Sequence, residues 1–400
     1  MTRKKFVFAL FTNNWLGVSE TFIFRQANSL LQYGDVFILT QNRKSSKILQ
    51  NSTFQPDVFL AERTKRALYS GILKRKLYLG KNLYAAANSQ LKIWEPILRE
   101  KKPDIIHAHY GTAGLAVVGL SNKLGIPQIT TFHGNDASVL VRKEVYLRSL
   151  KVLFLDSYII TVSKFIRDRL VQLGGNPNKI FCHYIGTDLS RFKYNKRKVS
   201  FGEKVRLNET IRFLQVSNFV EKKGHRYTVD AFARYLKHNS NAELILAGDG
   251  ATRLDIQKQV IGLGIESKVK FLGAVGPERV SELMGSSDVF LHHSITGENG
   301  SEEGIPTVIM EAMAVGIPVV STKHSGIPEL VVDKVGGILV AERNVNEYAE
   351  ALINFENLDS IEMAGKAFEM VRANFDIHKQ NESLFQLYQH VIDDFNKTQK

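Results

Sequence analysis

The sequence predicts an α/β protein made of two doubly wound domains, each with a parallel sheet. Its 400 residues suit two domains of roughly 100 to 200 residues each. Apolar runs of strand length alternate along the chain with stretches of helical apolar spacing. Glycine-containing loops follow several of these runs, and parallel sheets gather their ligands at such loops.

The composition is that of a globular protein. Hydrophobic residues make up 44% of the chain and charged residues 23%, so a sizeable core is available. Cys182 is the only cysteine, which excludes an internal disulfide and suits a reducing compartment. The apolar run at 6–11 is too short for a secretory signal and predicts a buried strand. No apolar run reaches about 18 residues, so we expect a cytoplasmic protein without a membrane-spanning helix.

Charge is distributed unevenly along the chain, whose net charge is +13. Residues 1–200 hold 32 Lys and Arg against 12 Asp and Glu, whereas residues 201–400 hold 21 against 28. The halves therefore carry +20 and −7. This asymmetry predicts that the first half meets an anionic partner, which could be nucleic acid, a membrane surface or a phosphorylated acceptor.

The first half opens with a strand at 6–11, a helix at 22–34 and a strand at 36–40. The loop after the first strand contains Gly17. A single glycine is not a dinucleotide fingerprint, because no G-x-G-x-x-G follows the strand.

A basic amphipathic segment follows at 62–84, where cations are interspersed with leucines and tyrosines. It could lie on an anionic membrane, each cation near the surface contributing on the order of 1 kcal/mol. It could equally be a core helix with a solvated basic face.

Two further strands end in histidine-containing loops. Strand 103–109 ends at His109, and the next strand is followed by His133 and Asp136. Because ligands gather at the carboxyl ends of parallel strands, His133 lies where chemistry is expected, although it could be a structural histidine. A metal pair of His107 with His109 is disfavoured, because no cysteine or carboxylate stands at ligand spacing nearby.

The segment 196–210 has no clear periodicity and predicts an interdomain linker. Strand 211–216 then opens the second domain, and the loop after it contains Asn218 and Lys223-Gly224. A lysine at the carboxyl end of a strand, held next to a glycine, can neutralise a diphosphate as a point charge; a plain basic loop is the alternative. Further strands are expected at 244–247 and 269–273. Val275 lies in the loop after the second of these strands.

The stretch 301–332 carries the strongest signal. Pro306 suits the first position of a helix, so a helix is expected from about Thr307. Its first N–H groups lack intrahelical partners and carry the positive end of the helix dipole, which favours phosphate. Glu303 before this corner and Glu311 one turn inside it could accept hydrogen bonds from two parts of one ligand, such as the sugar and the ribose of a nucleotide sugar. The alternative is a helix-capping carboxylate and a surface charge.

These segments resemble retaining glycosyltransferases of family 4, which have the GT-B fold. The resemblance rests on SEEGIPTVIMEAMAVGIPVVST and SGIPELV in the second half, and on SETFIFRQANSLLQYG, PDIIHAHYG and TFHGND in the first. It implies two Rossmann-like domains facing each other across a cleft, with acceptor mainly on the first and donor mainly on the second. The domains would span 1–195 and 211–378, and a helix at 379–400 would complete the first.

The resemblance also implies roles for residues. His133 would lie near the reacting centre, Lys223 would stabilise the leaving diphosphate, and Glu303 would bind the donor sugar's hydroxyls. Glu311 would bind the ribose, and Asn218 stands where the family usually has a second phosphate-binding cation, an arginine. The donor-binding set would be Gly17, Asn218, Lys223, Gly224, Val275, Glu303, Gly304, Ile305, Thr307, Val308 and Glu311. The acceptor side would hold Ser19, Glu20, His109 and Asp136.

The implied reaction transfers a sugar from a nucleotide diphosphate, UDP favoured over GDP, to an acceptor hydroxyl with retention and without a metal or cofactor. TGENGSEEGIP and HSGIPELV are most similar to transferases of bacterial exopolysaccharide, capsule and colanic acid assembly. Their acceptors are lipid-linked saccharides, such as those on undecaprenyl diphosphate, so peripheral binding to the inner face of the plasma membrane would fit the +20 half. A nucleotide-sugar-binding protein without turnover is the alternative that Asn218 motivates. A nucleic-acid-binding protein would leave Glu303, Glu311 and Lys223 unexplained, so no nucleic-acid partner is expected.

Overall fold

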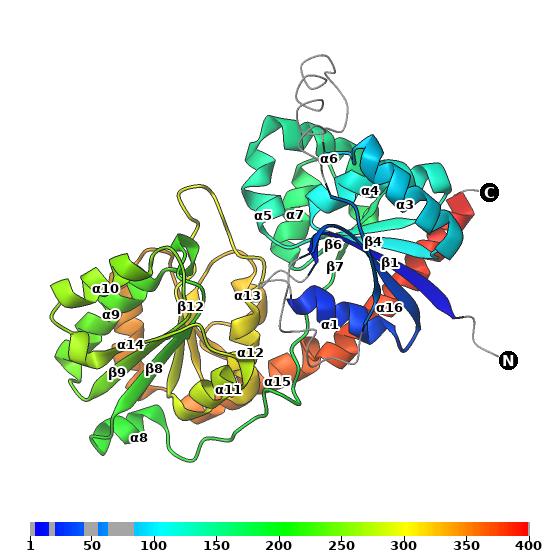
Figure 1. The fold of residues 1–400 in the computed structure, drawn as a ribbon. Coiled ribbons are helices and arrows are strands. Elements are labelled where there is room, and N and C mark those ends of the chain that lie inside the picture. Colours follow the sequence, from blue (N-terminus) through cyan, green and yellow to red (C-terminus); the bar gives the residue numbers. More distant parts are fainter. Residues whose placement is uncertain (1–4, 16–20, 44–54, 63–83, 399–400) are drawn as a thin grey trace. The chain divides into compact units, whose positions relative to one another are not determined.

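The computed structural model describes residues 5–15, 21–43, 55–62 and 84–398. The chain forms two compact units (Figure 1): Met1–His183 with Asn381–Lys400, and Tyr184–Gln380. The site candidates Gly17, Ser19 and Glu20 and nearly all of the basic segment 62–84 lie outside the described residues. Their roles therefore stay predictions.

The first unit is built on a sheet of parallel strands in the order β3-β2-β1-β4-β5-β6-β7. The strands are β1 Phe6–Trp15, β2 Gly34–Arg43, β3 Asp57–Leu60, β4 Ile105–His109, β5 Gln128–Phe132, β6 Tyr158–Thr161 and β7 Ile180–Cys182. Successive side chains of β1 enter opposite cores: Phe8 and Leu10 pack on one face, and Ala9 and Phe11 on the other. Helices cover both faces, so the sheet is buried as an α/β fold requires. The edge strands β3 and β7 are short, and the sequence pattern does not reveal them.

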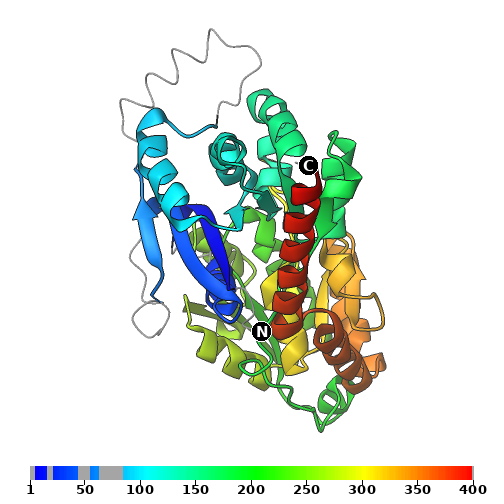
Figure 2. The same cartoon turned by 90° about the vertical axis from the view of Figure 1, so that its right-hand side faces the viewer.

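The helices of the first unit are α1 Thr21–Leu30, α3 Asn88–Lys101, α4 Gly111–Leu124, α5 Asn135–Ser138, α6 Glu144–Asp156, α7 Lys164–Gln172 and α16 Ile377–Thr398. The helix predicted at 379–400 is α16, drawn in red in Figures 1 and 2. It buries Leu384, Tyr388 and Val391 against the β1 core, at the spacing of one helix face. The Tyr388 hydroxyl accepts a hydrogen bond from Gln26 Nε2 at 3.1 Å, and Tyr158 donates to Asp394 at 2.6 Å. From Asn381 on, the last helix is thus part of the first unit.

The second unit has six parallel strands in the order β10-β9-β8-β11-β12-β13. The strands are β8 Ile211–Val216, β9 Ala242–Ala247, β10 Val269–Gly273, β11 Val289–His292, β12 Val319–Thr322 and β13 Gly337–Val340. The helices are α8 Phe201–Arg206, α9 His225–His238, α10 Arg253–Gly262, α11 Pro277–Ser286, α12 Thr307–Val315, α13 Ile327–Leu330, α14 Val345–Asn354 and α15 Ser360–Asn374. The strand order reverses between β8 and β11, and ligands of open parallel sheets bind beyond the carboxyl ends of strands at such a switch point. Two doubly wound parallel sheets confirm the predicted fold class.

The predicted boundary and linker need correction. The division falls after His183 rather than after 195, because Phe192 is buried in the core of the second unit and Tyr184 donates to Glu329 at 3.0 Å. The predicted linker 196–210 contains α8, whose Phe201 is buried in the second unit, where its ring contacts those of Phe213 in β8 and Phe355. One aromatic side chain in a short polar segment gives no visible period, which is why the sequence suggested a linker.

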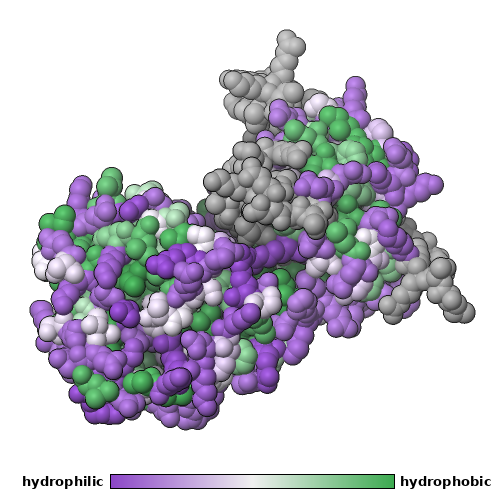
Figure 3. All heavy atoms as spheres, turned by 60° about the horizontal axis from the view of Figure 1, so that its bottom comes forward, coloured by the Kyte–Doolittle hydropathy of each residue, from purple (hydrophilic) through white to green (hydrophobic). Residues whose placement is uncertain are grey.

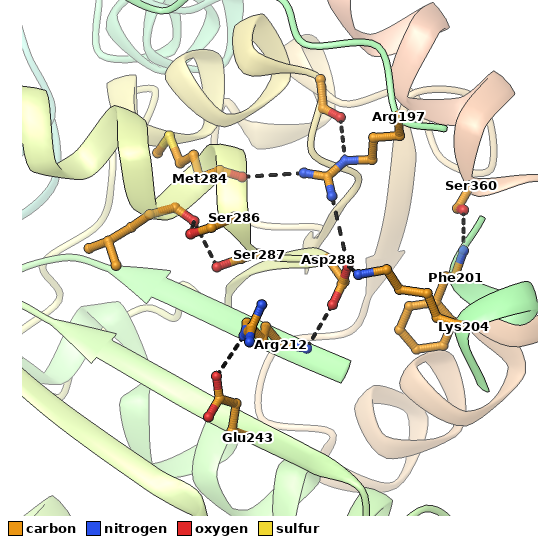
Figure 4. Close-up of polar contacts among 12 residues, drawn as sticks. Arg197, Phe201, Lys204, Arg212, Glu243, Met284, Ser286, Ser287, Asp288 and Ser360 are labelled. Atoms are coloured by element: carbon orange, nitrogen blue, oxygen red, sulfur yellow. Dashed lines mark hydrogen bonds and ion pairs between the residues drawn. The ribbon is translucent and has the colours of Figure 1, made fainter. Parts of the chain in front are cut away.

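Two cations of this segment hold a buried aspartate of the second unit (Figure 4). The Asp288 carboxylate lies 2.8 Å from Lys204 Nζ and 3.9 Å from Arg197 Nη1. It also accepts the backbone N–H of Arg212 in β8 at 2.8 Å. The Arg197 guanidinium donates further to the carbonyls of Gly316 and Met284. The segment is therefore fastened to the second unit by a charge cluster as well as by Phe201.

We expect Asp288→Asn to lower the free energy of unfolding by about 1–3 kcal/mol, because two cations lose a buried partner. The measurement is urea denaturation of the full chain, followed by hydrogen exchange within β8 and β11. Asp255→Asn, an exposed aspartate on α10, is the matched control and should change stability by at most about 0.5 kcal/mol. Equal effects of the two variants would contradict the stabilising role of the cluster.

The surface shown in Figure 3 is mostly hydrophilic, with apolar side chains between the polar ones in small groups. Within the described part of the chain, no helix combines the length and the apolar character needed to cross a membrane.

Candidate functional site

The loop after β8 brings Lys223 to the switch point. A short 3-10 turn, Glu221–Lys223, ends at Gly224, which has φ +61° and begins α9. A Cβ atom at Gly224 would lie 1.8 Å from the backbone oxygen of His293, so only glycine fits there. The carbonyl of Lys223 accepts a hydrogen bond from Gln215 Nε2 at 2.9 Å. The backbone of the lysine is therefore fixed.

Glu303 lies on the loop between β11 and α12, residues 293–306, here called the β11–α12 loop. Its side chain is buried, and its Oε1 lies 2.9 Å from Lys223 Nζ. Lys222 Nζ lies 3.7 Å from Oε2. Burial alone would raise the pKa of Glu303, but the two lysines outweigh it and lower this pKa to about 2. The carboxylate is therefore ionised at neutral pH.

The same carboxylate keeps capacity to bind a ligand. Lys223 Nζ lies 2.9 Å from Oε1, but each carboxylate oxygen can accept more than one hydrogen bond. A sugar hydroxyl is a donor of the required kind.

The helix predicted from Thr307 begins there, with Pro306 at the N-cap rather than at the first helical position. No side chain caps α12, so its N-terminal N–H groups suit an anion. Thr307 and Glu311 are four residues apart, which places them on one face of α12, and both are half-buried. The loop residues Gly304 and Ile305, just before the helix, are buried. The segment around Ile327 forms the short helix α13.

Lys223 and Glu303 thus come from loops that follow neighbouring strands, β8 and β11. Asn218, by contrast, is exposed, and its carbonyl accepts the N–H of Val220. The second cation at the site is Lys222, which donates to the carbonyl of Glu302 at 3.1 Å and which the sequence analysis did not assign. The doubled lysine in the sequence is the only signal that could have pointed to it. The loop after β10 leaves Val275 half-buried.

The first unit brings its predicted histidines together. His109 Nδ1 lies 3.3 Å from His133 Nε2, and the rings of His107 and His109 stack at 4.3 Å. His107 in turn contacts the Tyr388 hydroxyl of α16 and Thr131. Burial lowers the pKa of His109 to about 3 and holds that of His133 well below its usual range. Both rings are therefore neutral at pH 7.

Asp136 orders the loop that carries His133. One carboxylate oxygen accepts the backbone N–H groups of His133 and Gly134, and the other accepts that of Gly111, each at 3.0 Å. Asp136 and His109 are almost fully buried, so the structure gives them a role in holding His133. Their contact with an acceptor stays a prediction.

The described residues contain no group of three or more histidine, cysteine, aspartate or glutamate side chains arranged to hold a metal. Metal-independent transfer stays a prediction.

Comparison with known proteins identifies the class. Residues 45–191 match the family described as Glycosyltransferase Family 4, and residues 197–368 match Glycosyl transferases group 1. The chain is 30% identical to the putative colanic acid biosynthesis glycosyltransferase WcaL of Escherichia coli, over 93% of this chain and 96% of the relative. It is also 30% identical to the amylovoran biosynthesis glycosyltransferase AmsK of Erwinia amylovora, over 78% of this chain and 76% of the relative.

Solved structures agree on the fold. Anabaena HepE in complex with UDP superposes with a TM-score of 0.76 at 21% identity, covering 96% of this chain and all of HepE. WaaG, a glycosyltransferase involved in lipopolysaccharide biosynthesis, gives a TM-score of 0.63 at 16% identity, covering 96% of this chain and 99% of WaaG. With matches in both halves and relatives aligned over most of their length, the chain belongs to the family 4 glycosyltransferases and has their GT-B fold.

Proposed function

We propose that this glycosyltransferase moves a sugar from a UDP-sugar to a hydroxyl of a saccharide acceptor, with retention at the anomeric carbon and without a metal. The observation that carries the proposal is the cluster that the buried Glu303, on the loop that leads to the N-terminus of α12, forms with the half-buried Lys222 and Lys223. Two cations face one carboxylate, so the cluster has one positive charge left for an anionic diphosphate. The UDP complex of HepE supports the choice of base.

In this mechanism Lys223 and the first N–H groups of α12 hold the diphosphate. The bond between the anomeric carbon and the phosphate oxygen breaks as the acceptor oxygen bonds to the same face of the sugar, and the acceptor's proton passes to the leaving phosphate. Lys223 stabilises the charge that develops on that phosphate. Glu303 accepts hydrogen bonds from the donor sugar, and Glu311 accepts them from the ribose. His133 keeps the role that the family resemblance implies, near the reacting centre, as a neutral ring.

The acceptor we propose is a saccharide of surface polysaccharide assembly, linked to a lipid diphosphate. The names of the two bacterial relatives support the polysaccharide, and the +20 charge of residues 1–200 supports an anionic membrane partner. Sedimentation with vesicles of anionic and of neutral lipid in low salt tests the membrane part. Equal binding to both kinds of vesicle, or to neither, would contradict the proposed association with an anionic membrane.

Binding without turnover is the second candidate, because Asn218 replaces the usual arginine. Lys222 supplies a second cation, which favours the enzyme over this alternative. Release of free UDP that depends on added acceptor separates the two.

The donor class is tested by calorimetry with UDP, GDP and ADP. We expect UDP to bind tightest, and Glu311→Ala to weaken UDP about ten- to a hundredfold, because a charged hydrogen bond contributes about 1.5–3 kcal/mol. Glu350→Ala, an exposed glutamate on α14, is the control and should leave UDP affinity unchanged. Tighter binding of GDP would show that the donor base is guanine and not uracil. Unchanged UDP affinity in Glu311→Ala would contradict the proposed contact of Glu311 with the ribose.

A further inference from the structure

Glu303 lies on a loop without regular structure, so its position depends on individual contacts. Both of its backbone polar groups are bound by two consecutive residues that follow β12. The N–H of Glu303 donates to His324 Nε2 at 3.1 Å, and its carbonyl accepts from Ser325 Oγ at 2.6 Å. Ser325 has φ +47°, a sparsely populated conformation for a residue with a side chain. The fold therefore accepts local strain where it fixes Glu303.

The start of the same loop is held in a matching way by two residues that follow β13. The N–H of Thr296 donates to Glu342 Oε2 at 2.8 Å, and its carbonyl accepts from the guanidinium of Arg343. Arg343 also has a positive φ of +62°. Two pairs of consecutive residues thus fix both ends of the segment from Thr296 to Glu303.

His324 joins the two pairs. Because its Nε2 accepts an N–H, the neutral ring must carry its proton on Nδ1, and Nδ1 lies 2.6 Å from Glu342 Oε1. The His324 side chain is 1% exposed, so water has little access to the ring. Glu342 therefore holds Thr296 directly and Glu303 through one imidazole in a single tautomer.

We propose that His324 and Glu342 are positioning residues that set Glu303 at the place where it binds the donor sugar. The proposal rests on the donor-binding role of Glu303 given above. The contact chain runs from Glu342 through the His324 ring to the backbone of Glu303, whose side chain then meets Lys223. Neither residue needs to touch the donor. Their loss should weaken recognition of the sugar more than recognition of the nucleotide.

Two substitutions of the histidine separate its two hydrogen bonds. An asparagine amide superposes on the Nδ1 side of a histidine ring, and a glutamine amide superposes on the Nε2 side. His324→Gln should therefore keep an acceptor for the Glu303 N–H, whereas His324→Asn should keep only the contact with Glu342. The matched control is His238→Asn, in a histidine–glutamate pair with Glu356 (3.3 Å) at the far end of α9 from Lys223.

The first readout is amide hydrogen exchange at Glu303 in the protein without ligand. We expect His324→Asn to speed this exchange about tenfold or more, His324→Gln to lie between His324→Asn and wild type because it lacks the contact with Glu342, and His238→Asn to stay near wild type. Wild-type exchange in His324→Asn would overturn the proposal. So would equal acceleration in His324→Asn and His324→Gln, because packing of the ring and not its hydrogen bond would then hold the loop.

The second readout is the affinity for UDP-glucose relative to UDP, measured by calorimetry; UDP-glucose is the probe because HepE has been solved with it. His324→Asn should lower this ratio about tenfold, with UDP itself changed by less than about threefold and His324→Gln restoring most of the loss. An equal loss for UDP and UDP-glucose would contradict a role in sugar recognition. If the wild-type chain binds neither compound, the proposed donor class is wrong, while the exchange at Glu303 still decides whether His324 positions the loop.

Discussion

Lys223→Ala is expected to lower kcat/KM for glycosyl transfer by about a hundred- to a thousandfold, the usual effect of removing one group that stabilises charge in a transition state. The Lys223 ammonium has three N–H donors, and Glu303 Oε1 lies close to one side of it. The remaining N–H groups of Lys223 can donate to the leaving phosphate as negative charge develops on it. Lys222→Ala is the matched control, and we expect only about a tenfold loss because Lys222 lies 3.7 Å from Glu303 and donates to a backbone carbonyl.

The loss could instead arise from Glu303, which becomes a buried carboxylate with a weaker counter-charge when Lys223 is removed. The double variant Lys223→Ala with Glu303→Gln separates these causes. Removing the carboxylate should recover thermal stability but no activity, because the leaving phosphate still lacks its cation. Recovery of glycosyl transfer in the double variant would contradict the role of Lys223 in stabilising the leaving phosphate.

The fold could be predicted from the sequence because its elements are marked locally. Strands such as β8 and β10 are short apolar runs that begin and end where the pattern indicates, and α12 begins at Thr307. The prediction of a linker at 196–210 was wrong because the structure of this segment is not marked locally. α8 is short and polar, and it is held to the second unit by Phe201 and by the pairing of Lys204 with Asp288. Contacts over such sequence distances leave no local period.

Some residues of the candidate site stand in local sequence motifs, whereas others are brought together only by the fold. Lys223, Gly224 and Glu303 stand in compact motifs, and the resemblance of these motifs to family 4 enzymes is what selected them as candidates. His324 lies 21 positions after Glu303 and 18 positions before Glu342, and the pairing of β12 with both β11 and β13 brings the three together. The sequence segment HSGIPELV contains His324, but nothing in it shows that the ring faces the backbone of Glu303.

The buried histidines predict a loss of folding stability in mild acid. Six histidines among the described residues have a pKa lowered by burial, to about 3 for His109, His225 and His293 and well below the usual range for His107, His133 and His292. The unfolded chain takes up protons near pH 6.5, whereas the folded chain does not, so the free energy of unfolding falls as pH drops below that value. Each histidine contributes up to about 1.4 kcal/mol per pH unit between the unfolded and folded pKa values.

Urea denaturation at pH 7.5, 6.5 and 5.5 measures this slope. His109→Gln should remove about one of the protons taken up on unfolding and so reduce this slope. His390→Gln, which replaces an exposed histidine on α16, should leave the slope unchanged. A flat profile between pH 7.5 and 5.5 would contradict neutral buried histidines. Because His133 stays neutral in the folded protein over this range, its ionisation should not shape the pH dependence of transfer. Activity should then fall in acid together with the loss of folded protein, and this outcome would support the proposed role of His133 as a neutral hydrogen-bonding ring over a role as a cation.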